Sequence, residues 1–103
     1  QFDLKHGAGG IGDIEFLVQY LVLNNAKEHP HVIHYSDNIR QLDALAEAGC
    51  MENAVANRLQ DCYRGYRLRL HRLVLEKQAP LADSTEFDEE RRFVIASWNA
   101  WLI

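Results

Sequence analysis

The 103-residue sequence is poor in residues that cross-link or stiffen a chain, with only two cysteines and two prolines. Cys50 and Cys62 are too few for the disulfide framework of a small secreted domain, and sparse free thiols are typical of the reducing cytoplasm. The sequence also lacks an excess of basic charge, because 15 acidic and 11 basic residues leave a formal net charge of −4. Nucleic-acid binders are usually basic overall, so this composition argues against that class.

Long hydrophobic runs are missing as well. No apolar stretch approaches the roughly 18 residues that a membrane-spanning helix needs, so no membrane segment is predicted. The chain starts at Gln1, and no basic-then-apolar leader follows it. We therefore expect residues 1–103 to form a single helical domain that is a C-terminal piece of a longer chain.

Apolar residues recur at helical spacing in four stretches, and no stretch keeps the alternation of a β-strand. The predicted helices cover residues 13–27, 37–48, 53–77 and 86–101. Between the first two, His29, His31 and His34 lie in a short connector without a cysteine or acid at ligand spacing, so they do not predict a metal site. The sequence predicts an all-α, four-helix, bundle-like domain with short connections.

The first predicted helix is apolar on nearly all sides. Phe16, Tyr20 and Leu23 widen its apolar stripe beyond the width that one core contact requires. We expect this helix to pack inside something larger than the present chain. If that neighbour is absent, the segment is expected to associate with itself.

A glycine-rich segment with one lysine precedes the first helix. Lys5 is followed by Gly9 and Gly10, and the helix begins with Asp13 and Glu15. Backbone N–H groups in such a loop can bind an anion, but a tight turn that packs the helix is an equally open interpretation. The two acids point about 200° apart on a helix, so they cannot share one metal ion; helix-dipole complementation explains them as well.

A basic row lies on the third predicted helix. Arg64, Arg67 and His71 share one face through their three- and four-residue spacing. They are candidates for contact with phosphate or an acidic partner. A solvated face with local ion pairs is the alternative, and His71 also fits a buried, hydrogen-bonded histidine.

The residue types of common catalytic sites do not occur in a usable arrangement. We find neither the paired carboxylates of a two-metal phosphoryl-transfer site nor a Ser-His-Asp or Cys-His set. Cys50 and Cys62 have no neighbouring base and are interpreted as packing residues. We therefore assign no catalytic residue and no metal ligand.

The opening of the chain follows a specific pattern. It reads Asp3-Leu4-Lys5-x-Gly7-x-Gly9-Gly10-Ile11-x-Asp13-Ile14-Glu15-Phe16. This pattern resembles the bacterial glutamine synthetase adenylyltransferase family, whose members attach AMP to glutamine synthetase and remove it. The resemblance implies that Lys5, Gly9, Gly10, Asp13 and Glu15 form a loop near the nucleotide.

Later segments resemble the C-terminal, adenylylating half of the same family. They are Gln19–Leu23, Ser36–Arg40 and the ending Ser97-Trp98-x-x-Trp101-Leu102. On the third helix, Tyr63, Arg67 and His71 match a Y-x-x-x-R-x-x-x-H pattern of the family. The chain departs from the family at Tyr35, Cys62 and Tyr66, where Trp, Ala and Leu are usual, and these swaps affect packing.

The resemblance implies that the metal-binding carboxylates lie in a catalytic domain upstream of this segment. Mg-ATP would serve the whole enzyme, which transfers AMP to a tyrosine of glutamine synthetase; this segment is expected to bind no cofactor and to be inactive alone. Its expected partners are the upstream catalytic domain, glutamine synthetase and the PII signalling protein. The alternatives are a stand-alone helical interaction module, the matching domain of the adenylyl-removing half, or that of a uridylyltransferase.

Overall fold

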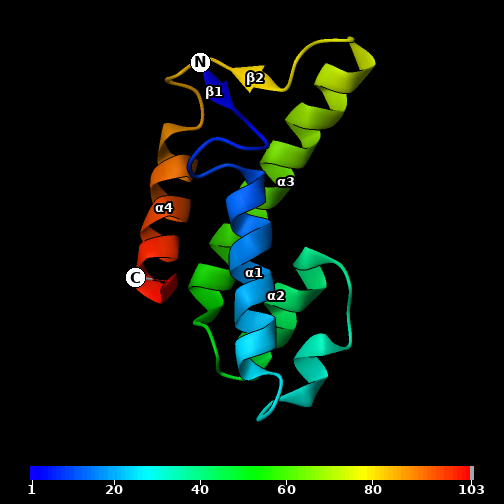
Figure 1. The fold of residues 1–103 in the computed structure, drawn as a ribbon, viewed down its shortest axis with the longest axis vertical. Coiled ribbons are helices and arrows are strands. Elements are labelled where there is room, and N and C mark those ends of the chain that lie inside the picture. The colour runs from blue at the N-terminus through cyan, green and yellow to red at the C-terminus, as the bar shows by residue number, and fades with distance from the viewer. Residues whose placement is uncertain (103) are drawn as a thin grey trace.

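Four helices dominate the computed structural model, which describes residues 1–102. They are α1 (Ile11–Asn25), α2 (Asn38–Glu47), α3 (Asn53–Leu75) and α4 (Asp88–Leu102). α1 runs along the centre, with α4 on one side and α2 on the other, while the long α3 passes behind it (Figure 1). This arrangement confirms the predicted all-α, four-helix fold.

Two small features were predicted as loops and connectors. Strands β1 (Phe2–Asp3) and β2 (Leu81–Ala82) pair in antiparallel register, with Phe2 opposite Ala82, and join the start of the chain to the segment after α3. The 3₁₀ helix η1 (Pro30–Ile33) occupies the histidine connector. Strands of two residues are too short to show an alternating pattern, so the sequence could not reveal them.

The start of α4 differs from the prediction. The helix begins at Asp88 rather than Glu86, because Phe87 has a φ of +63° and cannot belong to a right-handed helix. The ring of Phe87 packs edge-on against Phe2 and Tyr66 at centroid distances of 6.4 and 5.1 Å. This aromatic contact lies where the strand pair, α3 and α4 meet.

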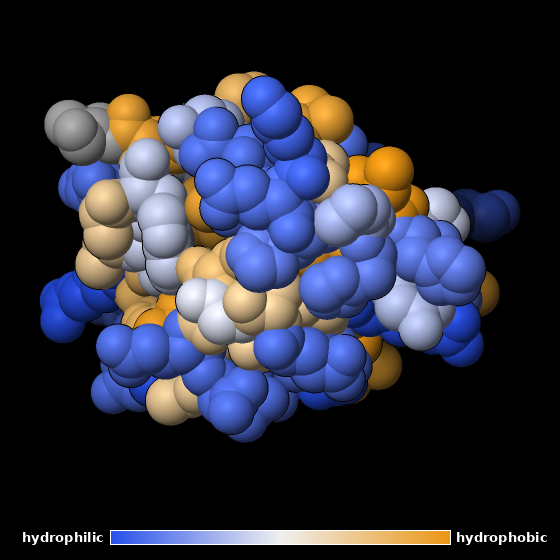
Figure 2. All heavy atoms as spheres, turned by 90° about the horizontal axis from the view of Figure 1, so that it is seen from below, coloured by the Kyte–Doolittle hydropathy of each residue, from blue (hydrophilic) through white to orange (hydrophobic). Residues whose placement is uncertain are grey.

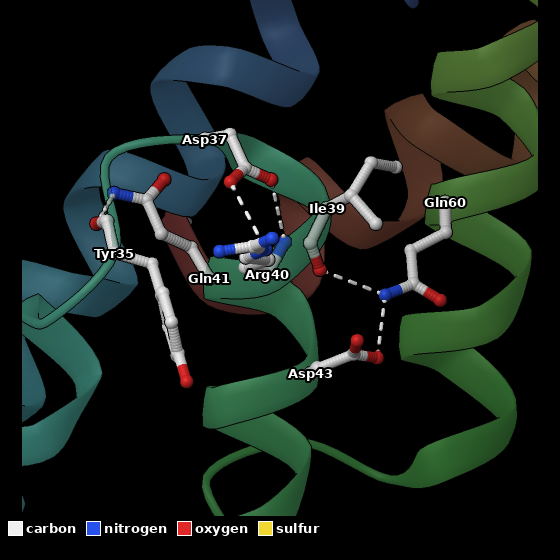
Figure 3. Close-up of polar contacts among 7 residues, drawn as sticks. All are labelled: Tyr35, Asp37, Ile39, Arg40, Gln41, Asp43 and Gln60. Atoms are coloured by element: carbon white, nitrogen blue, oxygen red, sulfur yellow. Dashed lines mark hydrogen bonds and ion pairs between the residues drawn. The ribbon is translucent and has the colours of Figure 1, made fainter.

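Local hydrogen bonds set the ends of α2, which lie within one residue of the predicted range 37–48. The Asp37 carboxylate accepts a 2.9 Å bond from the backbone N–H of Arg40 and caps the helix (Figure 3). At the other end, Gly49 takes a φ of +78°, and the N–H of Cys50 returns to the Leu45 carbonyl. These two caps explain why α2 stops after ten residues.

A buried amide ties α3 to α2. The Gln60 side-chain nitrogen donates to the Ile39 carbonyl at 2.9 Å and to the Asp43 carboxylate at 2.7 Å (Figure 3). Because Gln60 is almost fully buried, losing these acceptors would leave an unsatisfied polar group. The contact holds α3 in register against α2.

The inner face of α1 supplies the centre of the core. Its buried residues are Ile11, Ile14, Leu17, Val18, Leu21 and Val22. The outer face remains accessible: Phe16 is 58% exposed and Leu23 68% exposed, as the over-wide apolar stripe predicted. Phe16 contacts the ring of Trp98 at 5.2 Å, and both tryptophans of α4 pack partly buried against the core.

The end of the molecule seen from below carries hydrophilic residues over most of its surface, with smaller hydrophobic areas between them (Figure 2). Among residues 1–102, no helix is both long and apolar enough to cross a membrane.

Candidate functional site

The backbone N–H groups of the glycine-rich loop before α1 donate to acceptors in the loop itself and in the first turn of α1. The N–H of Gly9 donates to the Asp13 carboxylate at 2.8 Å, and that of Ile11 donates to the Leu4 carbonyl at 2.9 Å. The N–H groups of Gly10 and Gly12 also donate within the loop. The hydrogen bonds thus fit the tight-turn interpretation rather than an anion cradle made of free N–H groups.

Gly9 and Gly10 permit close backbone approach. A Cβ on Gly9 would stand 2.7 Å from the Arg91 carbonyl oxygen, and its φ is +80°. A Cβ on Gly10 would stand 2.7 Å from the Leu4 carbonyl oxygen. The Gly9 carbonyl accepts a 2.7 Å bond from the buried hydroxyl of Tyr66, so α3 and α4 both hold the loop in place.

Asp13 and Tyr66 therefore support the loop from two helices. Burial raises the pKa of the Tyr66 hydroxyl well above its usual value, so Tyr66 remains a hydrogen-bond donor at neutral pH. From the sequence, Tyr66 was assigned only a packing role, and this contact was not indicated, because its partner lies 57 positions away.

Asp3 orders the backbone at Lys5, two residues later. Its carboxylate accepts hydrogen bonds from the N–H groups of Lys5 and His6 at 2.9 and 3.0 Å. The hydrogen bond from the His6 backbone is the main cause that lowers the pKa of the Asp3 carboxyl. In the sequence, Asp3 was named only as part of the family motif. An Asp whose carboxylate accepts from the N–H two residues later is nevertheless a known turn signal.

A groove joins the two groups of candidate residues that the sequence kept separate. Lys5 from the loop and Glu15 from α1 share it with Arg67 and His71 from α3. Its volume is about 630 Å³, within the usual range for ligand sites. Gly9, Gly10 and Asp13 do not line it. The hydrogen bond from Gly9 to Asp13 instead stabilises the loop.

The groove has mixed chemistry. Ile11, Tyr63, Leu70 and Val74 supply an apolar lining between the charged residues. The guanidinium of Arg67 lies 5.8 Å from the centroid of the Tyr63 ring, a distance at which a cation and an aromatic face attract each other. This stacking places the Arg67 cation at the edge of an apolar surface.

A second, smaller hollow adjoins the groove on the other side of a row of α3 side chains. It measures about 330 Å³ and shares Tyr63, Arg67 and His71 with the first. Ile39 and Arg64 belong only to this second hollow. Arg67 and His71 thus border both hollows, and Arg64 borders the second.

The basic residues of this surface differ in whether they already have an ion-pair partner. Arg64 lies 3.6 Å from Asp61, whereas among residues 1–102 neither Lys5 nor Arg67 makes an ion pair within 4.0 Å. His71 is exposed, so the interpretation of His71 as a buried, hydrogen-bonded residue is wrong. Lys5 and Arg67 are therefore available to an anionic ligand.

The remaining candidates have structural explanations. Burial raises the pKa of the Cys62 thiol, and partial burial does the same for Cys50, in keeping with their interpretation as packing residues. The rings of His29 and His31 meet edge-on with centroids 6.2 Å apart in the connector. Within the described part of the chain, no three His, Cys, Asp or Glu side chains could hold a metal ion together.

Comparison with known proteins decides the family. The family model described as GlnD PII-uridylyltransferase matches residues 1–97, which is nearly the whole chain. The chain belongs to this family. The match covers the glycine loop, α1, α2, α3 and most of α4, so both sides of the groove lie inside it.

Curated relatives extend this result. The chain is 48% identical over 98 residues to a bifunctional glutamine synthetase adenylyltransferase/adenylyl-removing enzyme from Pseudomonas aeruginosa, covering 95% of this chain and 10% of that protein. Relatives of the same name from Hahella chejuensis and Mannheimia haemolytica are 48% and 40% identical, covering 95% and 99% of this chain, and 10% and 11% of those proteins.

These relatives confirm the resemblance to glutamine synthetase adenylyltransferases that the Lys5–Glu15 motif indicated. The chain spans about a tenth of the length of the curated relatives it matches. Their name covers both the transferring and the removing activity, so the choice of the adenylylating half stays a prediction from the later sequence segments.

Proposed function

We propose that this chain is the helical C-terminal portion of an enzyme that transfers AMP from ATP to a tyrosine of glutamine synthetase. In this role it supports an upstream catalytic domain and contributes to partner recognition. The observation that carries the proposal is the groove in which the loop of the family motif meets the basic row of α3. Relatives with the adenylyltransferase name over 95% of the chain support it.

Catalysis itself is assigned to the upstream domain. When bound there, Mg-ATP supplies the AMP group, and the metal neutralises charge that develops on the transferring phosphoryl group. The described residues of this chain offer no carboxylate cluster for that metal, so we assign it no step of the reaction. We place the enzyme in the cytoplasm, where the free thiols Cys50 and Cys62 stay reduced.

The proposed contact with the catalytic domain uses two surfaces of this chain. In this proposal, the loop that carries Lys5 lies beside the nucleotide site. This placement is supported by the ordered loop backbone, which Asp3 holds, and by the exposed side chain of Lys5. The exposed apolar face of α1, with Phe16 and Leu23, packs against the catalytic domain. Removal of this cover explains why the segment alone is expected to self-associate.

The experiment compares two forms of the enzyme's C-terminal half. One ends immediately before Gln1, and the other continues through Ile103. AMP transfer from ATP to glutamine synthetase is followed with each. Transfer by the longer form alone supports the proposal. Equal transfer by both contradicts the supporting role, and the same forms are then assayed for PII binding. Transfer by neither contradicts the family role or the choice of half.

Lys5→Ala tests the loop within the longer form. We expect a higher KM for ATP or a lower turnover, with unchanged thermal stability, because the side chain is exposed and its backbone contacts remain. Lys27→Ala, at an exposed lysine outside the groove, is the matched control. Unchanged kinetics of Lys5→Ala would contradict the placement of this loop near the nucleotide.

The two other readings of the chain predict different results. A stand-alone interaction module requires that its native upstream sequence contain no nucleotidyltransferase motif. A domain of the adenylyl-removing half, or of a uridylyltransferase, requires that the longer form release AMP from glutamine synthetase or transfer UMP to PII.

A further inference from the structure

The two hollows adjoin each other on either side of one row of side chains on α3. They share Tyr63, Arg67 and His71, which follow one another at four-residue spacing and form a ridge between the hollows. A helix with its side chains is about 10–12 Å wide. An extended peptide of about five residues, at roughly 3.3 Å per residue, is long enough to cross this ridge and reach both hollows.

The chemistry across this ridge follows the order apolar, cationic, apolar. Leu70 and Val74 line the first, larger hollow, Arg67 and His71 form the ridge, and Leu68 lines the second, smaller hollow. Leu68 and Val74 are 74% and 67% exposed, so apolar area is available on both sides of the basic residues. The complementary ligand carries negative charge at its centre and apolar side chains at both ends.

Charge complementarity identifies the occupant. The chain is acidic overall, with a net charge of −4, and Glu15 lines the first hollow. The ridge that both hollows share nevertheless carries Arg67 and His71 and no acid, and Arg67 has no ion-pair partner among the described residues. A guanidinium that lies near the Tyr63 ring and has no acidic partner can bind a carboxylate through two parallel hydrogen bonds.

A nucleotide fits this surface less well. Phosphate sites usually employ backbone N–H groups, and in the neighbouring loop those of Gly9, Gly10, Ile11 and Gly12 are already bonded. The row of Tyr63, Arg67 and His71 also separates the two hollows, whereas a nucleotide is usually held in a single cavity.

We infer that the groove along α3 binds an extended acidic segment of a protein partner, with a central carboxylate on Arg67 and flanking apolar side chains in the two hollows. This inference deepens the partner-recognition part of the proposed function and rests on it. It adds the class of ligand and the apolar residues that select it.

The test titrates the 103-residue chain into a fluorescein-labelled nonapeptide, SGLSESLGS, and follows fluorescence anisotropy. In an extended chain its two leucines and its glutamate face the same side, because side chains alternate. The neutral peptide SGLSQSLGS and the apolar-deleted peptide SGSSESSGS are run in parallel. We expect the acidic, apolar peptide to bind at least about tenfold more tightly than either, because each loses one of the two kinds of contact. Similar binding of all three peptides, or no binding, overturns the inference.

Two substitutions locate the binding. Arg67→Glu is expected to weaken binding at least about tenfold, since it reverses the central charge. Arg72→Glu makes the same change on the same helix outside both hollows and is expected to alter binding less than about twofold. Leu68→Asn tests the second, smaller hollow. Equal losses from Arg67→Glu and Arg72→Glu would show only a general charge effect and overturn the site.

Folding and ligand class are checked in the same series. Arg67 and Leu68 are exposed, so the circular dichroism of these variants should match that of the parent chain. If ATP displaces the peptide at ATP concentrations below about 1 mM, the groove is assigned to a nucleotide and the peptide inference is overturned. Loss of the peptide result with intact AMP transfer contradicts this inference alone and leaves the proposed function standing.

Discussion

At the scale of single residues, the two glycines Gly9 and Gly65 occupy opposite environments. A Cβ on Gly9 would collide with the backbone of Arg91, whereas a Cβ on Gly65 would meet nothing within 4 Å. Among the described residues, no neighbouring helix approaches Gly65 closely enough to require a glycine. Only the three-dimensional neighbours distinguish a required glycine from a dispensable one.

Gly9→Ala is expected to destabilise the chain by about 2 kcal/mol or more, because it adds both a collision and an unfavourable φ. Gly65→Ala is expected to stabilise it by up to about 1 kcal/mol, since alanine is the better helix former. Urea unfolding followed by circular dichroism measures both. A loss of stability in Gly65→Ala would show that the open space beside α3 is filled.

The buried hydroxyl of Tyr66 and the buried thiol of Cys62 make the stability of the fold depend on alkaline pH. Burial raises both pKa values above the ordinary 10.0 and 9.0, so the folded state resists ionisation that the unfolded chain accepts. Their contribution to stability is complete below pH 9 and is lost as the pH rises through the folded-state pKa values. We expect the free energy of unfolding to decline above about pH 9.

Urea unfolding at successive pH values from 7 to 11 measures this decline. Tyr66→Phe lowers stability at neutral pH by about 1–3 kcal/mol, because the Gly9 carbonyl loses its partner. The same variant should also show a shallower alkaline decline than the parent. A decline of equal slope in both proteins would contradict the role of Tyr66.

At the scale of elements, helix boundaries follow from local chemistry while helix contacts do not. Asp37 and Gly49 delimit α2 through groups within five residues of each other in sequence, and the predicted range 37–48 matches both ends to within one residue. The start of α4 was misplaced by two residues because the φ of Phe87 is held by packing on Phe2 and Tyr66. A long-range contact thus overrode the local pattern.

Asp37→Ala is expected to cost about 1 kcal/mol of stability, because the first turn of α2 loses its side-chain acceptor. Asp37→Asn retains an acceptor oxygen and serves as the matched control. Thermal unfolding followed by circular dichroism compares the two. If both substitutions cost the same, the charge of Asp37 rather than its capping bond stabilises the helix.

At the scale of the whole molecule, one side of α1 remains uncovered by the described residues. Phe16 and Leu23 are more than half exposed although the opposite face of the same helix is fully packed. The sequence indicated this excess of apolar surface from the width of the stripe alone. It could not indicate that Trp98 of α4 comes to lie beside Phe16.

The isolated chain is expected to self-associate as its concentration rises, because this apolar face is accessible. Leu23→Lys should shift sedimentation-velocity profiles toward the monomer. Leu75→Lys, at an apolar position on α3 that is similarly exposed, is the control and should leave the profiles unchanged. A chain that stays monomeric at all concentrations would contradict this expectation.

The sequence by itself determined the four helices, because helical periodicity and capping groups act over a few neighbouring residues. It also identified the family through the Lys5–Glu15 motif, which the comparisons confirmed. The tertiary structure alone decided that Lys5 and Arg67 line one groove and that Tyr66 holds Gly9. These pairs are separated by some 60 residues, and only the packing of α1 against α3 brings them together.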